Sequence, residues 1–228
     1  MSRRQPSPIL RPAQAKYLAS LRPFRDALVA EMEKYAHEHD IPIALPDLGR
    51  LLEALAASRP GGRILEIGSA IGYGTLRLAR GAREGQVVTI ERDPARIAIA
   101  RQYLETGGVM ARVELLEGEA LEVLRGVRGP FDLVYIDGDK RDYRRCLDLT
   151  LPLVAVGGYV VVDNLLWHGA IADPKLRAED DSAAREIERF NPYFMIHPQL
   201  ATVLLPLGDG VGLGVKKKIT IREMGGPF

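Results

Sequence analysis

The sequence has little cysteine, almost no net charge and no long apolar run. Its 228 residues contain one cysteine, Cys146, so an intrachain disulfide and a thiolate metal cluster are excluded, which is typical of a reducing compartment. Lys and Arg total 31 against 30 for Asp and Glu, and a charge this close to zero gives no global attraction to nucleic acid or anionic membranes. No segment approaches the roughly 20 apolar residues of a membrane span, and the start of the chain is basic and proline-interrupted rather than signal-like. We therefore expect a cytoplasmic protein.

A chain of this length with 46% apolar residues can bury one full core. We expect a flexible arm over residues 1–12 and a single domain over residues 13–228. Helical spacing of apolar residues predicts two helices, within 22–40 and 47–62, before the first strand.

Short apolar runs then alternate with longer amphipathic segments. The runs predicted as strands are 63–68, 86–91, 112–117, 131–137 and 158–163. The predicted helices between them are 74–80, 94–105, 120–125 and 143–151. This alternation is typical of a parallel, doubly wound α/β sheet with helices on both faces. A further helix is expected near 182–190, and residues 200–218 read as a terminal antiparallel hairpin with a Gly-Asp-Gly turn.

The turn after the first predicted strand carries the first chemical signal. In "RILEIGSAIGYG" the order is E-x-G-x-x-x-G-x-G, with Glu66 in the strand and Gly68, Gly72 and Gly74 after it. A dinucleotide site would favour G-x-G-x-x-G facing a pyrophosphate, which the charge of Glu66 would repel. The pattern therefore favours a cationic ligand, although an ordinary strand-to-helix turn would also place glycines here.

Two more strand ends extend this site. Glu91 ends the second predicted strand, where a carboxylate can accept hydrogen bonds from both hydroxyls of a ribose, or can be an ordinary solvated charge. Glu119 and Ala120 follow the third strand, where an adenine edge would lie. An amine, a ribose and a base without phosphate together describe S-adenosylmethionine.

Oxygen-bearing side chains follow the fourth and fifth predicted strands. Asp137, Asp163 and Asn164 are expected at neighbouring carboxyl ends, and three oxygen donors suit Mg²⁺ or Ca²⁺. A single strand-end aspartate can equally be a helix cap, as we expect for Asp139. Lys140, three residues beyond Asp137, is either a solvated lysine or a general base whose pKa a nearby cation would depress.

The loop after Asn164 leaves two interpretations open for each of its prominent side chains. His168 is either a second base or a surface hydrogen-bonding group, and Trp167 either packs the loop or forms a wall of the pocket.

The sequence resembles the cation-dependent O-methyltransferases, the family of catechol and caffeoyl-CoA O-methyltransferases and their bacterial relatives. The resemblance spans about 41–216 and rests on "ILEIGSAIGYGTLRLA", "VVTIERD", "GEALEVL", "FDLVYIDGDKRDY", "GGYVVVDNLLWHG" and "LLPLGDGVGLG". It implies a Rossmann-like seven-stranded sheet with an antiparallel last strand, a homodimer, metal ligation by Asp137, Asp163 and Asn164, and Lys140 as general base beside Asp137. The expected cofactor-binding set is Ala44, Leu45, Glu66, Gly68, Ser69, Gly72, Tyr73, Gly74, Glu91, Arg92, Gly118, Glu119, Ala120 and Asp137.

The chain departs from the family pattern at two positions. Many relatives carry serine or threonine where this chain has Gly74, so a contact with the methionine carboxylate must come from backbone or water. Relatives often carry aspartate in place of Glu119, which shifts an adenine contact.

The expected reaction transfers the methyl group of S-adenosylmethionine to a hydroxyl with a vicinal oxygen. The acceptor is either a catechol-like small molecule or 5-hydroxyuridine at the wobble position of transfer RNA, since the chain is also similar to bacterial enzymes that methylate that nucleoside. Three basic clusters are available for RNA phosphates: Arg3, Arg4 and Arg11; Arg141, Arg144 and Arg145; and Lys216 to Lys218. A nicotinamide dehydrogenase is disfavoured, since no tyrosine is followed four positions later by lysine. A non-catalytic S-adenosylmethionine-binding module would not need Lys140 beside the acidic set.

Overall fold

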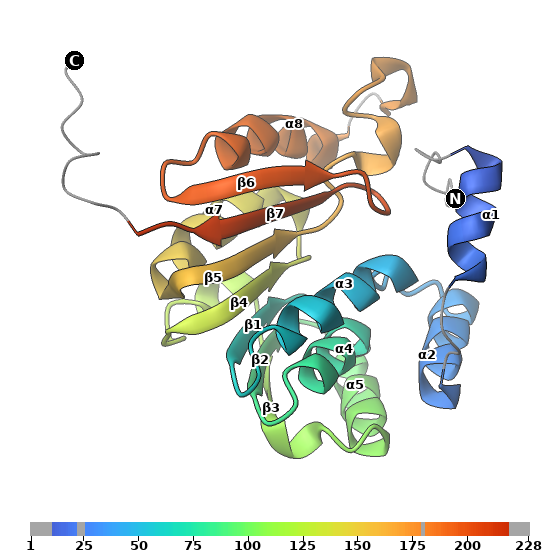
Figure 1. Ribbon diagram of the computed structural model, residues 1–228, viewed down its shortest axis with the longest axis vertical. Helices are drawn as coiled ribbons and strands as arrows, with labels where there is room; N and C mark the ends of the chain where they lie inside the picture. Colours follow the sequence, from blue (N-terminus) through green and yellow to red (C-terminus); the bar gives the residue numbers. More distant parts are fainter. Residues whose placement is uncertain (1–10, 22–25, 179–180, 219–228) are drawn as a thin grey trace.

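A seven-stranded sheet forms the centre of the computed structural model, which describes residues 11–21, 26–178 and 181–218 (Figure 1). The strand order is β3-β2-β1-β4-β5-β7-β6. The strands are β1 (Arg63–Ile67), β2 (Gln86–Glu91), β3 (Val113–Glu117), β4 (Phe131–Ile136), β5 (Val154–Val162), β6 (Leu200–Leu205) and β7 (Val211–Lys216). Neighbours among β1 to β5 are parallel, whereas β7 runs antiparallel to β5 and β6. This topology confirms the predicted doubly wound sheet with an antiparallel last strand.

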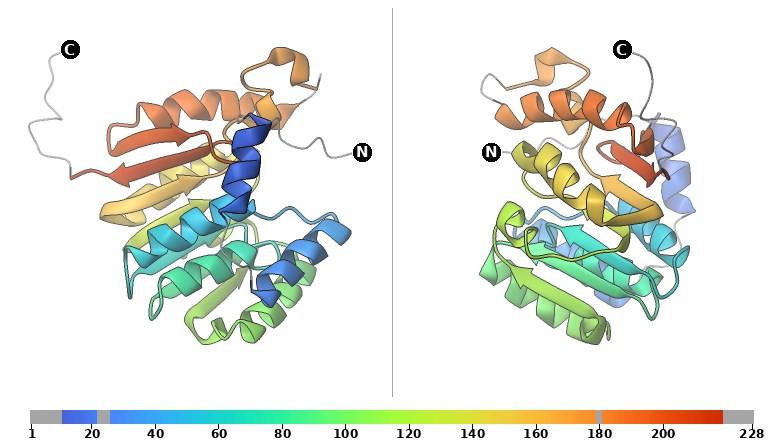
Figure 2. Two further views of the ribbon diagram at one scale, coloured as in Figure 1. Left: turned by 45° about the vertical axis from the view of Figure 1, so that its right-hand side comes forward. Right: turned by 90° about the vertical axis from the view of Figure 1, so that its left-hand side faces the viewer.

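Helices pack on both faces of the sheet (Figure 2). The helices are α1 (Pro12–Ser20), α2 (Ala27–Glu38), α3 (Pro46–Ala57), α4 (Tyr73–Gly81), α5 (Pro94–Thr106), α6 (Ala120–Val123), α7 (Tyr143–Thr150) and α8 (Ser182–Met195). One apolar core lies between the sheet and α2 to α5, and a second lies between the opposite face and α7 and α8. Among the described residues no helix is both long and apolar enough to span a bilayer.

Three elements differ in length from the prediction. β5 begins at Val154, four residues early, because it pairs with β4 on both sides of a register shift. α6 ends at Val123, two residues before the predicted end. α8 continues to Met195 through Pro192, since Phe194 packs against β7 where Gly212 leaves room for its ring. Residues 1–10 of the predicted arm lie outside the described residues.

The two halves of the sheet are covered differently. The half built from β3, β2, β1 and β4 has helices on both faces, whereas β5, β7 and β6 are covered on the α8 face (Figures 1 and 2). On the opposite face the register aligns Val161, Leu213 and Val203 in one row. Val161 is buried in the core and Val203 is 43% exposed, so the outer part of this apolar sheet face, toward β6, is open in a single chain.

Candidate active site

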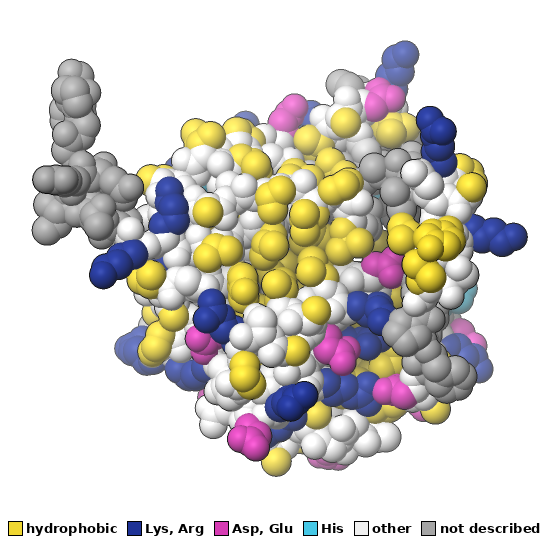
Figure 3. Space-filling model, in the orientation of Figure 1, with side chains coloured by type: hydrophobic (Ala, Val, Ile, Leu, Met, Phe, Trp, Pro, Cys, Tyr) yellow, Lys and Arg dark blue, Asp and Glu magenta, His cyan; other side chains and the backbone are white. Residues whose placement is uncertain are grey.

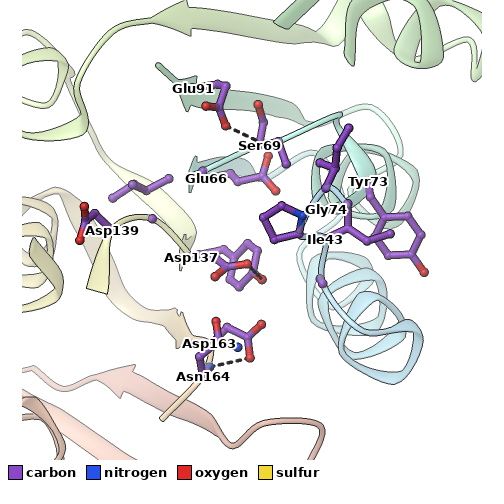
Figure 4. A pocket seen from close by; sticks show the side chains of 18 of the residues that line it. Ile43, Glu66, Ser69, Tyr73, Gly74, Glu91, Asp137, Asp139, Asp163 and Asn164 are labelled. Carbon is purple, nitrogen blue, oxygen red and sulfur yellow. Dashed lines mark hydrogen bonds between the residues drawn. The ribbon is translucent and has the colours of Figure 1, made fainter. Parts of the chain in front are cut away.

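A cavity of about 1100 Å³ opens at the carboxyl ends of the parallel strands, which is where ligands gather in doubly wound sheets. Every residue of the predicted cofactor, metal and catalytic sets lines it except Gly72. Figure 4 shows Asp137 between Glu66 and Asp163, with Glu91 farther along the same edge. The structure therefore brings together side chains that come from four different strands.

Two glycines shape the turn after β1 in different ways. Gly68 has φ +92°, and a Cβ there would collide with the carbonyl oxygen of Asp137, so the turn passes directly over the end of β4. Gly72 has φ +84° and is the N-cap of α4, and a Cβ on it would point toward Ala100 of α5. Gly72 thus lies behind the cavity wall, where it permits close packing of α4 on α5.

Glu66 is a buried carboxylate aimed into the cavity wall. One of its oxygens, Oε2, accepts hydrogen bonds from the hydroxyls of Thr75 and Thr89. The other, Oε1, has no partner among the described residues, and neither does the buried hydroxyl of Ser69. The pKa of Glu66 is raised to about 7, mainly by burial; the two hydroxyls oppose this rise and the charges of Asp137 and Glu91 add to it. An unpaired buried carboxylate oxygen fits the ammonium group of a bound amino acid.

The environment of Glu66 also accounts for Gly74. A Cβ on Gly74 would collide with Glu66 Oε1, so the carboxylate occupies the space that a serine or threonine side chain would need. Glycine at position 74, where many relatives carry serine or threonine, is therefore explained by the position of the Glu66 carboxylate.

Glu91 is fixed by backbone groups at the end of β2. Its Oε2 accepts from the Ala70 N–H at 2.9 Å, and its Oε1 accepts from Arg92 and Asp93 at 3.0 Å each. These bonds hold the carboxylate beside the glycine turn, where its remaining lone pairs can accept ribose hydroxyls. Farther out, the Arg92 guanidinium lies 3.6 Å from Glu119 at the exposed rim.

The carboxylates after β4 and β5 form the most strongly charged part of the cavity. Lys140 Nζ lies 2.7 Å from Asp137 Oδ1, and the Tyr135 hydroxyl donates to Asp137 Oδ2 at 3.1 Å. Burial raises the pKa of Asp163 well above its usual range; the charge of Asp137 adds to this effect and Lys140 opposes it. A buried carboxylate that faces a second, half-buried one fits a cation.

The candidate metal set is composed of two carboxylates and one amide. Across residues 11–21, 26–178 and 181–218, no group of three or more His, Cys, Asp or Glu side chains is arranged to hold a metal ion. Asp163 Oδ1 accepts from the backbone N–H of Asn164 at 2.7 Å. The oxygens of Asp137, Asp163 and Asn164 match the ligand chemistry of Mg²⁺, which commonly keeps several waters and few protein ligands.

Comparison with known proteins places this geometry in a family. A family model described as O-methyltransferase matches residues 23–218. The chain belongs to the O-methyltransferase family. It is 38% identical to a catechol O-methyltransferase of Mycobacterium tuberculosis, over 73% of this chain and 77% of that protein. It is 30% identical to a catechol O-methyltransferase of Niastella koreensis, over 84% of this chain and 90% of that one.

A solved relative shows the cofactor. The O-methyltransferase TomG from Streptomyces achromogenes, involved in tomaymycin synthesis and crystallised with S-adenosylmethionine, superposes with a TM-score of 0.78 at 30% identity, covering 90% of this chain and 96% of TomG. The present chain is therefore an S-adenosylmethionine-dependent O-methyltransferase.

Asp209 contributes to this O-methyltransferase site and was missed by the sequence analysis. Asp209, in the turn between β6 and β7, is nearly buried and lines the cavity. Its Oδ1 accepts from the backbone N–H of His168 at 2.6 Å, and its Oδ2 accepts from Asn164 Nδ2 at 3.3 Å. The sequence marks this position as a turn, and only the long-range pairing of β7 with β5 brings it to the site.

The loop after Asn164 has an unusual backbone. Asn164, Trp167 and His168 have φ values of +62°, +45° and +55°, and each such non-glycine residue costs on the order of 1 kcal/mol or more. Trp167 and His168 both line the cavity, and Trp167 Nε1 donates to Asp181 at 2.7 Å. Trp167 thus combines both predicted roles, since it braces the loop and forms part of the wall.

Proposed function

We propose that this O-methyltransferase depends on a divalent cation and methylates a hydroxyl that has a vicinal oxygen, on a catechol-like small molecule. The observation that carries the proposal is the contact of Lys140 with Asp137 beside the buried Asp163, in the same cavity as Glu66 and Glu91. The two relatives named catechol O-methyltransferase support this acceptor class.

The residues of the cavity divide the work. Glu66 and Glu91 are suited to hold the amine and the ribose of the cofactor, whose sulfonium supplies an activated methyl group. Asp137, Asp163 and Asn164 would hold a divalent cation, which would supply Lewis acidity that lowers the pKa of an acceptor hydroxyl. Lys140 accepts the hydroxyl proton after its ammonium has left Asp137 and has released a proton to solvent.

Methyl transfer then needs little more than alignment. The acceptor oxygen forms a bond to the methyl carbon while the carbon–sulfur bond breaks, and the sulfonium leaves as the neutral thioether of S-adenosylhomocysteine. Because the donor is already activated, holding oxygen, carbon and sulfur in line supplies much of the rate.

A transfer RNA acceptor is less well supported by the surface charges. Arg141 pairs with Asp139, Arg145 lies 3.8 Å from Asp142, and Lys216 donates to the backbone carbonyls of Leu151 and Val154. These side chains already have partners, so phosphate contacts would have to replace existing ones. Of the other predicted basic groups, Arg3 and Arg4 lie outside the described residues.

The test offers two acceptors in parallel. Labelled S-adenosylmethionine is incubated with caffeate or with transfer RNA bearing 5-hydroxyuridine, each with Mg²⁺ or with a chelator. We expect labelling of caffeate that the chelator abolishes. Labelling of the RNA alone would show that transfer RNA, and not a catechol, is the acceptor. Labelling that persists in chelator would contradict the metal site.

We also propose a cytoplasmic location. The free, buried state of Cys146 is consistent with it.

We further propose that a second copy of the chain covers the open part of the sheet face over β7 and β6. Figure 3 shows hydrophobic side chains gathered over the middle of this face. In α1 no residue is buried, and Tyr17 is 64% exposed. A nine-residue helix is only marginally stable without a packing partner. One chain thus has both an unpacked helix and an uncovered sheet face. In a symmetric dimer, α1 of each copy can pack on the open sheet face of the other.

Two variants test this dimer by sedimentation. Val203→Glu places a charge in the open face and should convert a dimer into a monomer. Ile196→Glu is the matched control, since Ile196 is 81% exposed at the end of α8, on the covered side. A monomeric parent protein, or a dimer that Val203→Glu leaves intact, would refute the proposal.

A further inference from the structure

His168 and Asp209 form a contact that the mechanism above does not use. The backbone N–H of His168 donates to Asp209 Oδ1 at 2.6 Å, and His168 Nδ1 lies 3.4 Å from Asp209 Oδ2. The side chain of Asp209 is 5% exposed and that of His168 is 45% exposed. Asp209 therefore holds the histidine from the protein side, and the imidazole remains accessible at the edge of the cavity that both residues line.

The backbone around His168 is held in place from several directions. The N–H of Leu166 donates to the carbonyl of Asp209 at 2.8 Å, and that of Leu165 donates to Gly210 at 2.9 Å. The rings of Trp167 and His168 lie 5.3 Å apart. Left-handed non-glycine residues persist only where the surroundings enforce them, and they cluster at functional sites. The β6–β7 turn thus fixes the position from which the His168 ring meets the cavity.

The strand order places His168 on one side of the proposed metal ligands and Lys140 on the other. Along the sheet edge, Lys140 follows β4, Asp163 and Asn164 follow β5, and Asp209 precedes β7. The cofactor carboxylate Glu66 belongs to β1, next to β4. Of two vicinal oxygens bound across this edge, one lies on the side of Lys140 and the cofactor, and the other lies on the side of Asp209.

We infer that His168, positioned by Asp209, contacts the acceptor oxygen that is not methylated and thereby selects which of two vicinal oxygens receives the methyl group. With Nδ1 directed at Asp209, Nε2 is the ring nitrogen available to the acceptor. The inference rests on the proposed function, because it requires an acceptor with two neighbouring oxygens.

Caffeate tests it, since its 3- and 4-methyl ethers are separable products. We expect His168→Ala to shift the isomer ratio at least about fivefold toward equality and to raise the KM for caffeate by a similar factor, as loss of one hydrogen bond to the acceptor would. Asp209→Asn keeps an oxygen for the His168 N–H but removes the carboxylate beside Nδ1, so a smaller shift in the same direction is expected. His197→Ala is the control, because that ring packs against Tyr193 outside the cavity.

A second readout does not require turnover. Binding of 4-nitrocatechol to the protein saturated with S-adenosylhomocysteine should weaken in His168→Ala and stay unchanged in His197→Ala. An unchanged isomer ratio and unchanged nitrocatechol affinity in folded His168→Ala would overturn the inference while leaving the proposed function intact. Failure of the parent enzyme to methylate caffeate with Mg²⁺ would instead overturn the proposed function and the inference with it.

Discussion

The two ends of the cavity are built in different ways. The cofactor end uses side chains at the ends of β1 and β2, and Glu91 is held by the backbone N–H groups of the two residues that follow it and by that of Ala70, in the turn after β1. The acceptor end depends on Asp209, which contacts a loop 41 residues earlier in the chain. The cofactor end is therefore encoded within one β1–α4–β2 unit, whereas the Asp209 part of the acceptor end forms only once β7 has paired with β5. Variants at the two ends should accordingly affect binding of the cofactor and transfer of the methyl group separately.

The largest difference between an effect on methyl transfer and an effect on cofactor binding is expected at Lys140. Lys140→Met removes the proposed base and should lower kcat for caffeate by about 10²–10⁴-fold, because the methionine cannot accept the hydroxyl proton. Affinity for S-adenosylhomocysteine, measured by calorimetry, should change by less than about threefold. Lys34→Met is a suitable control, since Lys34 is an exposed lysine of α2. Equal kcat values for Lys140→Met and the parent protein would remove Lys140 from the mechanism.

Glu66 should give the cofactor end its own pH signature. Its pKa is about 7 when folded against 4.5 in an exposed chain, so the unfolded state releases this proton first as pH rises. The free energy of unfolding of the cofactor-free protein should therefore fall between pH 4.5 and 7, by on the order of 3 kcal/mol from this group.

Denaturant unfolding at several pH values measures the slope of the unfolding free energy against pH. Glu66→Gln keeps the shape of the side chain and should flatten the slope relative to the parent protein. Glu84→Gln changes an exposed carboxylate and should leave it as it was. A parent slope that Glu66→Gln does not alter would show that Glu66 does not titrate in this range.

A smaller effect is expected at Glu91. Glu91→Gln removes the charge proposed to receive the ribose hydroxyls and should raise the KM for S-adenosylmethionine by about 10–100-fold, the value of one or two such hydrogen bonds. The kcat at saturating cofactor should change little, since the acceptor end is untouched. Glu117→Gln, at the exposed end of β3, is the matched control. A fall in kcat with an unchanged KM would place Glu91 in the transfer step instead.

The difference between the two ends also explains what sequence could predict. Strand ends are visible as apolar runs that stop at or near a carboxylate, so the sequence predicts Glu66, Glu91, Asp137 and Asp163 at one edge of the sheet, and all four line the cavity. Gly72 carries the same glycine signal as Gly68, and only the packing of α4 on α5 shows that it faces away from the cavity.

Contacts between segments that are distant in the chain could not be predicted from sequence patterns. Asp209 lies in a Gly-Asp-Gly turn that any hairpin could carry, and its partners depend on the β5–β7 pairing. The sequence also does not show which faces of the sheet are covered, because the alternation along β6 does not reveal that a helix packs on only one of its faces. The fold and the carboxylates that follow the strands could be predicted from the sequence, whereas the contribution of Asp209 to the acceptor end required the three-dimensional structure.

Asp163→Asn tests the central claim, that cofactor binding and metal-assisted transfer reside in separate parts of one cavity. The substitution keeps the size of the side chain and removes one proposed ligand charge. With Mg²⁺ present, methyl transfer to caffeate and calorimetric binding of S-adenosylhomocysteine are measured on the same preparation. We predict that transfer falls by about 1000-fold, as loss of several kcal/mol of metal assistance requires, while binding changes by less than about threefold. Transfer that persists at the parent rate, or binding that falls together with transfer, would contradict the account.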